Sequence, residues 1–304
     1  MRKKIFIAGH QGMLGSAIYK VIKKKNIKVL TAIRKELNLE NYRDVNLWFK
    51  KNKPDYVIIA AAKAGGIFDN AKYPVDYMLV NIKIQTNIIS LSHKYKIKKL
   101  IFIGSSCIYP KNSKTPIKES ELLKGELEPT NQWYALTKIH GVKMCEAYNK
   151  QYNSNFSCVM PTNLFGLNDK YGENSHVIPA LLKRIHQSKV KKDPYVKVWG
   201  DGTPKREFMY ADDCAKIICR ILFNKKYFKL INIGTGKDIT IKNLAQTICK
   251  VVGYNGKLKF EKKMPNGVQK KTLDISKIRK MNLNKFSNFE KAINITYQDF
   301  LKNN

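Results

Sequence analysis

Hydrophobic residues in the first half of the chain occur in short runs, and segments with helical spacing separate these runs. The runs are mostly aliphatic and β-branched, which is typical of strands that are buried on both faces of a sheet. They cover Ile5–Ala8, Val29–Ile33, Tyr56–Ala61, Leu100–Ile103 and Phe156–Met160. Helices are predicted between them, for example at Ala17–Lys24, Val80–Tyr95 and Tyr134–Tyr152. This alternation predicts a parallel sheet with right-handed crossover connections.

The second half of the chain has a different pattern. One more strand is predicted at Leu230–Ile233, but loops lengthen around residues 166–174 and 200–207, and the regular alternation is lost. We therefore expect an α/β fold with a doubly wound, Rossmann-type parallel sheet over residues 1–165, to which segments near 208–235 return. A smaller, irregular C-terminal lobe over residues 166–304 would complete a ligand cleft at the carboxyl ends of the strands.

The charge of the chain is strongly positive, because 57 basic residues oppose 23 acidic ones and give a formal charge of +34. Such a balance raises the question of nucleic-acid binding. However, the longest lysine run is only Lys23–Lys25, the other basic residues are spread along the chain, and no basic tail or aromatic-interleaved patch occurs. We expect a solvated lysine-rich surface, no specific nucleic-acid partner, and a ligand such as a nucleotide diphosphate.

The sequence also indicates the compartment. Its apolar stretches are too short to span a bilayer, and its first residues have the pattern of a strand and not of a signal peptide. Six cysteines form no Cys-x-x-Cys pair and have no zinc spacing; they are Cys107, Cys145, Cys158, Cys214, Cys219 and Cys249. We expect a cytoplasmic protein without membrane association or a metal site, in which most of these cysteines are reduced and buried.

A glycine-rich turn directly follows the first predicted strand and precedes a helix. Its residues are Gly9, His10, Gln11, Gly12, Met13, Leu14 and Gly15. Glycine allows a tight turn and a close approach of the backbone to a pyrophosphate, and the helix N-terminus supplies unpaired N–H groups. Glycines also occur in ordinary turns, but the position between a strand and a helix favours dinucleotide binding.

The end of the second predicted strand distinguishes between the two nicotinamide dinucleotides. An acidic residue at this position would bind a ribose 2′-hydroxyl, whereas an arginine accommodates a 2′-phosphate. The chain has Arg34 here and no carboxylate before Glu36. This pattern indicates NADPH, and residues 1–165 then form the NADP-binding domain, with the substrate-binding lobe after them. The alternative is that Arg34 is an ordinary surface residue.

Candidate catalytic residues lie on the helix and the strand end that face this cleft. Tyr134 and Lys138 are four residues apart, so both side chains lie on one face of a predicted helix. A lysine cation near the phenol is expected to lower the tyrosine pKa and to make it a better proton donor or acceptor. Ser105, at the end of the fourth predicted strand, can hydrogen-bond a carbonyl oxygen that receives a hydride. A Tyr-x-x-x-Lys pair alone occurs by chance in many helices, but its position after the glycine turn favours a reductase.

Several longer motifs are similar to those of one family. The chain resembles the GDP-L-fucose synthases (GDP-4-keto-6-deoxy-D-mannose 3,5-epimerase/4-reductases) of the extended short-chain dehydrogenase/reductase superfamily, over nearly its whole length. The motifs are GHQGMLGSAI at 9–18, AAKAGGI at 61–67, GSSCIYP at 104–110, MPTNLFG at 160–166, NSHVIPALL at 174–182 and VWGDGTPKREF at 198–208.

The resemblance implies a role for further residues. Cys107 and His176 match the acid/base pair that epimerises the carbons beside the ketone, and the enolate would use the Tyr134 and Ser105 donors. Beside the glycine turn and Arg34, the residues implied to contact NADPH are Ser105, Ser106, Lys138, Pro161, Thr162, Asn163, Leu164 and His176. Those implied to contact a GDP-sugar are Arg184, Trp199, Arg206 and Asn266. A homodimer through the helices at Val80–Tyr95 and Tyr134–Tyr152 is also implied.

Two positions depart from the family pattern, because Gln11 replaces a frequent arginine and Asn266 a common aspartate. Related dehydratases carry Asp and Glu where this chain has Ser106 and Cys107, and simple 4-epimerases have a small inert residue in place of Cys107. The expected reaction is therefore NADPH-dependent 3,5-epimerisation and 4-keto reduction of GDP-4-keto-6-deoxy-D-mannose to GDP-L-fucose. Two alternatives stay open: action on a related sugar such as a GDP-6-deoxy-4-keto-heptose, and a non-catalytic NADP-binding regulator.

Overall fold

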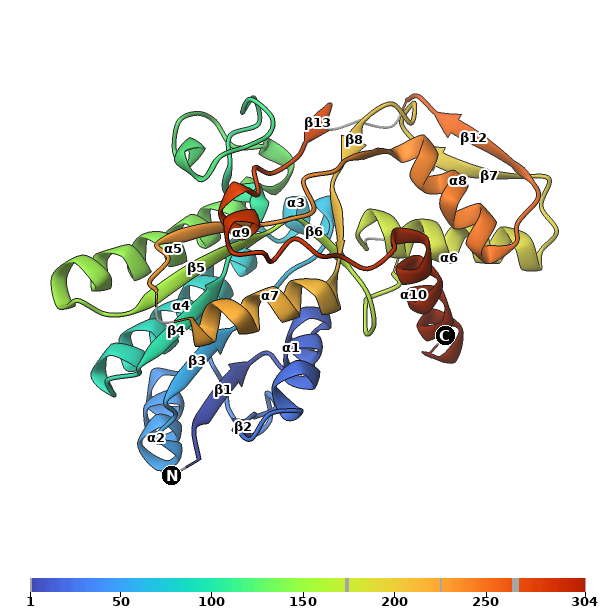
Figure 1. Cartoon of the computed structure of the whole chain (residues 1–304). Helices are drawn as coiled ribbons and strands as arrows, with labels where there is room; N and C mark the ends of the chain where they lie inside the picture. Colours follow the sequence, from blue (N-terminus) through green and yellow to red (C-terminus); the bar gives the residue numbers. More distant parts are fainter. Residues whose placement is uncertain (1, 173–174, 225, 264–267, 304) are drawn as a thin grey trace.

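A six-stranded parallel sheet forms the centre of the molecule, with the strand order β10-β5-β4-β3-β1-β2 (Figure 1). The computed structural model describes residues 2–172, 175–224, 226–263 and 268–303. The sheet strands are β1 Lys4–Ala8, β2 Lys28–Leu30, β3 Tyr56–Ile59, β4 Lys99–Ile103, β5 Phe156–Pro161 and β10 Leu230–Ile233. Every pair of neighbours is parallel. This arrangement confirms the predicted parallel sheet, and β10, from far along the chain, is one of its edge strands.

Helices cover both faces of the sheet, as expected for a doubly wound fold. On one side α1 (Met13–Lys23) packs against α7 (Ala211–Phe223). On the other side α4 (Pro74–Lys94) packs against both α2 (Tyr42–Asn52) and α5 (Gln132–Tyr152) (Figure 1). The strands between these layers are almost wholly buried, which explains their continuous apolar runs.

The order of the strands reverses beside β1, which determines where a ligand can bind. β1 pairs with β2 on one side and with β3 on the other, so the chain passes over β1 between these two strands. In such sheets the connections leave in opposite directions from the carboxyl ends of the two central strands, and this opens a crevice. The glycine-rich turn after β1 and the loop after β3 lie at this point.

Shorter strands and three helices build a second region. β6 (Asn163–Phe165) pairs with β9 (Phe208–Tyr210), and β7 (Tyr195–Trp199) pairs with β12 (Lys257–Glu261). β8 (Lys205–Arg206) lies between β11 (Ile239–Thr240) and β13 (Lys270–Lys271). The helices of this region are α6 Val177–Val190, α8 Ile241–Val252 and α10 Phe289–Asn303. The remaining elements are α3 Ile67–Lys72, α9 Ser276–Lys280 and the 3₁₀ turns η1 Ser106–Ile108, η2 Glu119–Glu121 and η3 Pro129–Asn131.

The second region has its own hydrophobic cluster. Leu182 of α6, Leu244 of α8 and Ile293 of α10 are fully buried in it, apart from the cluster that surrounds the sheet. The chain enters this region after β5 and returns to the sheet with α7 and β10, and α9 packs against β10. Segments near both ends of the second half therefore pass beside the carboxyl ends of the sheet strands.

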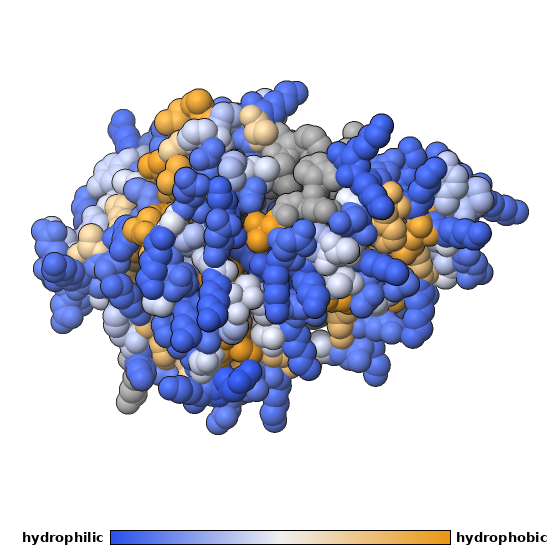
Figure 2. Space-filling view, turned by 90° about the horizontal axis from the view of Figure 1, so that it is seen from above, coloured by the Kyte–Doolittle hydropathy of each residue, from blue (hydrophilic) through white to orange (hydrophobic). Residues whose placement is uncertain are grey.

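The outer surface is strongly hydrophilic. Figure 2 shows blue, hydrophilic side chains over most of the face seen from above, with small apolar groups between them. Within the described ranges, no helix is both long enough and apolar enough to cross a membrane.

Candidate active site

The glycine-rich turn fits closely against the neighbouring strand. Gly9 has a φ of +87°, and a β-carbon there would lie 2.5 Å from the Ala61 backbone nitrogen. A β-carbon on Gly15 would overlap the Gly9 carbonyl oxygen. Gly12 precedes α1 without a side-chain cap, so the first N–H groups of this helix remain available for a ligand. The turn therefore has the geometry of a pyrophosphate site.

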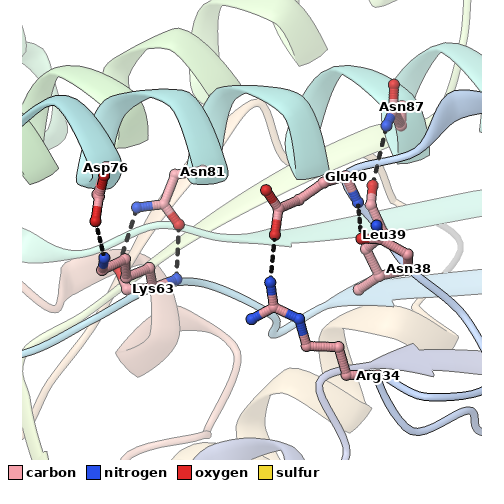
Figure 3. Close-up of polar contacts among 8 residues, drawn as sticks. All are labelled: Arg34, Asn38, Leu39, Glu40, Lys63, Asp76, Asn81 and Asn87. Carbon is pink, nitrogen blue, oxygen red and sulfur yellow. Dashed lines mark hydrogen bonds and ion pairs between the residues drawn. The ribbon is translucent and has the colours of Figure 1, made fainter.

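The loop after β3 lies opposite the turn and is fixed by one buried amide. The Asn81 side chain accepts a hydrogen bond from the Lys63 N–H (2.8 Å) and donates one to the Lys63 carbonyl (3.0 Å). The Lys63 ammonium is 2.8 Å from Asp76 at the surface (Figure 3). Asn81 thus satisfies both the N–H and the carbonyl of Lys63. The loop after β3, which forms one wall of the crevice, is therefore held in place by the protein itself.

Arg34 lies beyond the end of β2 with a side chain that is 83% exposed. β2 ends at Leu30, before the predicted Ile33, because the Glu36 carboxylate accepts the Ile33 N–H at 3.0 Å and closes a turn. Arg34 forms an ion pair with Glu40 at 2.9 Å (Figure 3). An exposed pair of this kind contributes little free energy, so a 2′-phosphate can replace Glu40 as the partner of Arg34.

Ser105 and the ammonium of Lys138 both lie at the end of β4. The Lys138 ammonium is buried, donates to the Ile103 carbonyl at 2.8 Å, and lies 5.4 Å from the centre of the Tyr134 ring. The Ser105 hydroxyl accepts the Cys107 N–H at 3.3 Å and caps η1. The sequence predicts that these side chains share one site, and in the structure they lie around the same strand end.

The net pKa of Tyr134 is raised, although the lysine by itself was expected to lower it. Burial raises the pKa of Tyr134, and the neighbouring Cys107 and Tyr77 raise it further. Burial also lowers the pKa of Lys138, to about 8. Burial is the largest cause of the raised Tyr134 pKa, and the Lys138 ammonium donates to the Ile103 carbonyl. Tyr134 is thus a protonated group, ready to donate.

Cys107 and His176 come from different regions. The Cys107 thiol is 6% exposed within η1, and its pKa is raised by burial, against opposing effects of Lys271, Ser105 and Lys138. His176 precedes α6, and its surface is open to solvent. Desolvation by neighbouring protein atoms lowers its pKa, so the imidazole is neutral near pH 7. No hydrogen bond between the two is present in the described structure.

The segment after β5 connects the two regions. Pro161 ends β5 and Leu164 lies in β6. The Thr162 hydroxyl (3.2 Å) and the Asn163 amide (2.9 Å) both donate to the backbone carbonyl of Glu207. These bonds hold the segment beside the crevice, where the resemblance had placed it against a nicotinamide.

Of the residues expected to bind substrate, Arg184 and Trp199 lie against each other, whereas Arg206 lies on a separate strand. Arg184 of α6 lies over Trp199, with 5.0 Å from its guanidinium carbon to the ring centre, and donates to the Lys197 carbonyl at 2.9 Å. Arg206 lies on β8, and burial lowers its pKa without removing its charge. Asn266 lies outside the described residues.

The structure adds one residue that sequence reasoning missed. Lys271 lies on β13, directly opposite Arg206 in the parallel register, and it acts electrostatically on Cys107. Burial lowers its pKa. No local pattern distinguishes this lysine, because it is one of 57 basic residues and lies far along the chain from Cys107.

Comparisons with known proteins show the family to which the chain belongs. Residues 5–234 match the model of the NAD dependent epimerase/dehydratase family. The chain is 44% identical to a GDP-L-fucose synthase of Escherichia coli K12, over 99% of this chain and 98% of that protein.

Two solved structures are also similar. A GDP-L-fucose synthetase from Naegleria fowleri bound to NADP has a TM-score of 0.91 and 28% identity, covering 100% of this chain and 95% of that one. A GDP-6-OMe-4-keto-L-xylo-heptose reductase from C. jejuni has a TM-score of 0.92 and 31% identity, covering 100% and 99%. The chain belongs to the NAD dependent epimerase/dehydratase family and, within it, to the family of the GDP-L-fucose synthases.

Proposed function

We propose that the protein converts GDP-4-keto-6-deoxy-D-mannose to GDP-L-fucose by 3,5-epimerisation and NADPH-dependent 4-keto reduction. The observation that carries this proposal is the clustering of Cys107 with Ser105 and Lys138 at the end of β4. A reductase needs only the hydroxyl, the tyrosine and the lysine. A thiol beside them adds the proton transfer that epimerisation requires.

The epimerisation uses the acidity of hydrogens next to a ketone. In this proposal one of Cys107 and His176 removes a proton from such a carbon, and the other returns a proton to the opposite face. The enolate oxygen is stabilised by hydrogen bonds from Tyr134 and Ser105. The neutral His176 and the largely protonated Cys107 suit a pair that exchanges these two roles.

The reduction uses the same donors at the 4-keto oxygen. Bound NADPH supplies the hydride that reaches carbon 4. Tyr134 donates the proton that the oxygen takes up, and Ser105 orients the carbonyl. Lys138 donates to the Ile103 carbonyl, and this hydrogen bond fixes the face of α5 that carries Tyr134. The Gly9–Gly15 turn and Arg34 fit the pyrophosphate and the 2′-phosphate of the cofactor, and Arg184, Trp199 and Arg206 line the part of the cleft proposed for the GDP-sugar.

The proposal also covers the oligomeric state of the protein and its place in the cell. We include a homodimer formed through α4 and α5, supported by the exposed apolar side chains of Val75 and Leu79 on α4 and Leu136 on α5. We also place the reaction in the cytoplasm, supported by six cysteines that are all free thiols.

The decisive experiment measures NADPH oxidation with GDP-4-keto-6-deoxy-D-mannose and identifies the product. GDP-L-fucose supports the proposal. A 4-reduced product without inversion would contradict the epimerase part. NADPH binding without turnover on this sugar, but with turnover on a GDP-4-keto-heptose, would favour the heptose alternative, which the close fold similarity to a heptose reductase supports.

Two substitutions separate the partial reactions. Tyr134→Phe is expected to lower reduction by about a thousandfold, as for loss of a general acid, while the affinity for NADP⁺ stays within about twofold. Cys107→Ser is expected to slow the exchange of solvent deuterium into the sugar more than it slows reduction. Cys249→Ser, at a half-buried thiol in α8, is the matched control and should leave both rates unchanged. Unaltered product stereochemistry and rate in Cys107→Ser would overturn the role of the thiol.

A further inference from the structure

A buried tyrosine of α4 packs against the proposed proton donor. Tyr77 lies near the start of α4 and Tyr134 near the start of α5, and the two helices pack against each other. The ring centres are 6.4 Å apart and the ring planes are at 85°, which is an edge-to-face contact. Tyr77 is only 1% exposed, whereas Tyr134 is partly exposed. The buried ring therefore forms a wall beside the ring that takes part in the reaction.

No hydrogen bond directs the Tyr134 hydroxyl within the described residues. The Thr137 hydroxyl donates to the backbone carbonyl of Tyr134 at 2.8 Å, which leaves the phenol unconstrained. The Lys138 ammonium lies 5.4 Å from the ring centre. Side-chain torsions would otherwise allow the ring of Tyr134 to change its rotamer. The direction of its hydroxyl therefore depends on the groups that pack against the ring.

Tyr77 is itself held by its neighbours on α4 and on the loop after β3. Its backbone carbonyl accepts a hydrogen bond from the Asn81 amide at 2.8 Å. The Lys63 ammonium lies 5.5 Å from its ring centre and is paired with Asp76 at 2.8 Å (Figure 3). A β-carbon on Gly65 would overlap the Tyr77 hydroxyl, so this end of the side chain lies directly against the loop. Tyr77 is thus fixed at its backbone, at its ring and at its hydroxyl.

The loop that holds Tyr77 also lies against the glycine-rich turn. A β-carbon on Gly9 would lie 2.5 Å from the Ala61 backbone nitrogen, so the two backbones are in close contact. Asn81 bonds to both the N–H and the carbonyl of Lys63, two residues further along this loop. A continuous series of contacts therefore runs from the proposed pyrophosphate site, through the loop after β3, to Tyr77 and on to Tyr134.

We propose that Tyr77 is a positioning residue for the reduction, because its ring holds the Tyr134 ring in the orientation from which the phenol donates a proton to the keto oxygen. The inference rests on the proposed function, in which Tyr134 is the proton donor. Proton transfer requires the donor oxygen to lie within hydrogen-bond reach of its acceptor, so a small displacement of the phenol is costly. The ring of Tyr77 makes the contact with Tyr134, so phenylalanine should be able to replace tyrosine at this position.

The first test compares two substitutions of Tyr77 in the reduction of GDP-4-keto-6-deoxy-D-mannose. Tyr77→Leu removes the ring and is expected to lower kcat by about tenfold or more, while the KM of the sugar and the affinity for NADP⁺ stay within about twofold. Tyr77→Phe keeps the ring and should restore kcat. An unchanged kcat in Tyr77→Leu would overturn the inference, whether or not the KM rises. A Tyr77→Phe protein as slow as Tyr77→Leu would also overturn it, because the ring contact would then not be what matters.

A matched control removes another buried ring, on α2. Phe49 is fully buried and forms an edge-to-face contact with Phe6, with 5.9 Å between the ring centres. Phe49→Leu and Tyr77→Leu should both lower the melting temperature, because each substitution leaves a cavity. Only Tyr77→Leu should lower kcat when both variants are assayed well below their melting temperatures. An equal loss of kcat in the two variants would show a general effect of destabilisation and would overturn the inference.

The second test needs no sugar, so it separates the inference from the proposed function. NMR relaxation of the Tyr134 ring carbons is measured with NADP⁺ bound, and their signals are assigned by their loss in Tyr134→Phe. The order parameter of this ring is expected to fall in Tyr77→Leu and to keep its wild-type value in Tyr77→Phe. An order parameter in Tyr77→Leu equal to that of the wild type overturns the inference. If the wild-type protein does not reduce the sugar, the proposed function fails, while the order parameter still decides whether Tyr77 holds Tyr134.

Discussion

Glycine is required at positions 9 and 12 of the same turn for different reasons. Gly9 combines a φ of +87° with a contact so close to Ala61 that no β-carbon fits. A β-carbon on Gly12 would meet only the Gly9 carbonyl oxygen, at the ordinary distance of 3.6 Å. The protein fold therefore requires glycine at the first position, whereas only a ligand that approaches the backbone requires it at the second.

Alanine substitutions at these two positions make this distinction measurable. Gly9→Ala is expected to destabilise the fold by about 2 kcal/mol or more, through backbone strain and overlap. Gly12→Ala is expected to cost about 1 kcal/mol or less in stability but to weaken NADP⁺ binding by about tenfold or more, because the methyl group occupies the path of the pyrophosphate. Denaturant unfolding and calorimetric titration with NADP⁺ give the two quantities. Wild-type affinity in Gly12→Ala would mean that the pyrophosphate passes elsewhere.

Residues with a local signature could be recognised in the sequence, whereas residues defined by distant partners could not. The glycine turn follows a strand, and Tyr134 and Lys138 share one helix face, so short-range patterns suffice for them. Glu207 becomes important only when residues near 235 and 273 come to lie against it. The same reason explains why the raised pKa of Tyr134 was not foreseen, because burial depends on the packing of the whole site and the spacing of Tyr134 and Lys138 does not.

At the scale of elements, a buried lysine secures the end of α7. The Lys99 ammonium at the start of β4 donates to the carbonyls of Ile221, Asn224 and Lys226, at 2.9, 2.9 and 3.1 Å. Ile221 lies in the last turn of α7, and Asn224 and Lys226 follow its end, where carbonyls need partners from outside the helix. Lys99 is only 2% exposed, and burial lowers its pKa to about 8. One side chain thus joins the sheet to the helix that covers it.

Removing this cap should destabilise the protein. Lys99→Met retains the aliphatic length but leaves the carbonyls unsatisfied, so a loss of about 2 kcal/mol is expected from urea unfolding. The neighbouring Lys98 offers the control, because it forms an ion pair with Asp55 while its side chain is 63% exposed. Lys98→Met should cost less than about 1 kcal/mol. Similar losses in both variants would contradict the capping role of Lys99.

Apart from the edge strand β2, the sheet strands were predictable because each is almost wholly buried and therefore mostly apolar. Their ends were less certain, as the early end of β2 shows, since the Glu36 carboxylate competes for the Ile33 N–H. The two-residue strands β8, β11 and β13 were not predicted at all. Such strands carry no periodicity, and they form only because β8 happens to lie between the other two.

At the scale of the whole molecule, α4 and α5 present apolar residues to solvent. Val75 is 64% and Leu79 is 52% exposed on α4, and these two residues share one helix face. Burying this face against a second copy would remove it from water, which is the reason to expect a dimer.

Charge placed on this face should prevent assembly. Leu79→Arg is expected to convert the dimer to a monomer in sedimentation velocity, because an unpaired cation would have to be buried at the interface. Leu301→Arg, at a comparably exposed leucine on α10, should leave the sedimentation coefficient unchanged. A wild-type protein that sediments as a monomer at micromolar concentration would contradict the proposed dimer.

The two hydrophobic clusters are completed by different parts of the chain, and this has a consequence for biosynthesis. The last strand of the sheet, β10, ends at Ile233, whereas α10, which closes the second cluster, begins only at Phe289. A chain still emerging from the ribosome can therefore assemble its sheet and its glycine turn before the second cluster is complete. NADPH, if present during translation, would meet the glycine turn already formed on the nascent chain, whereas the region proposed for the sugar nucleotide is completed only when α10 has been made.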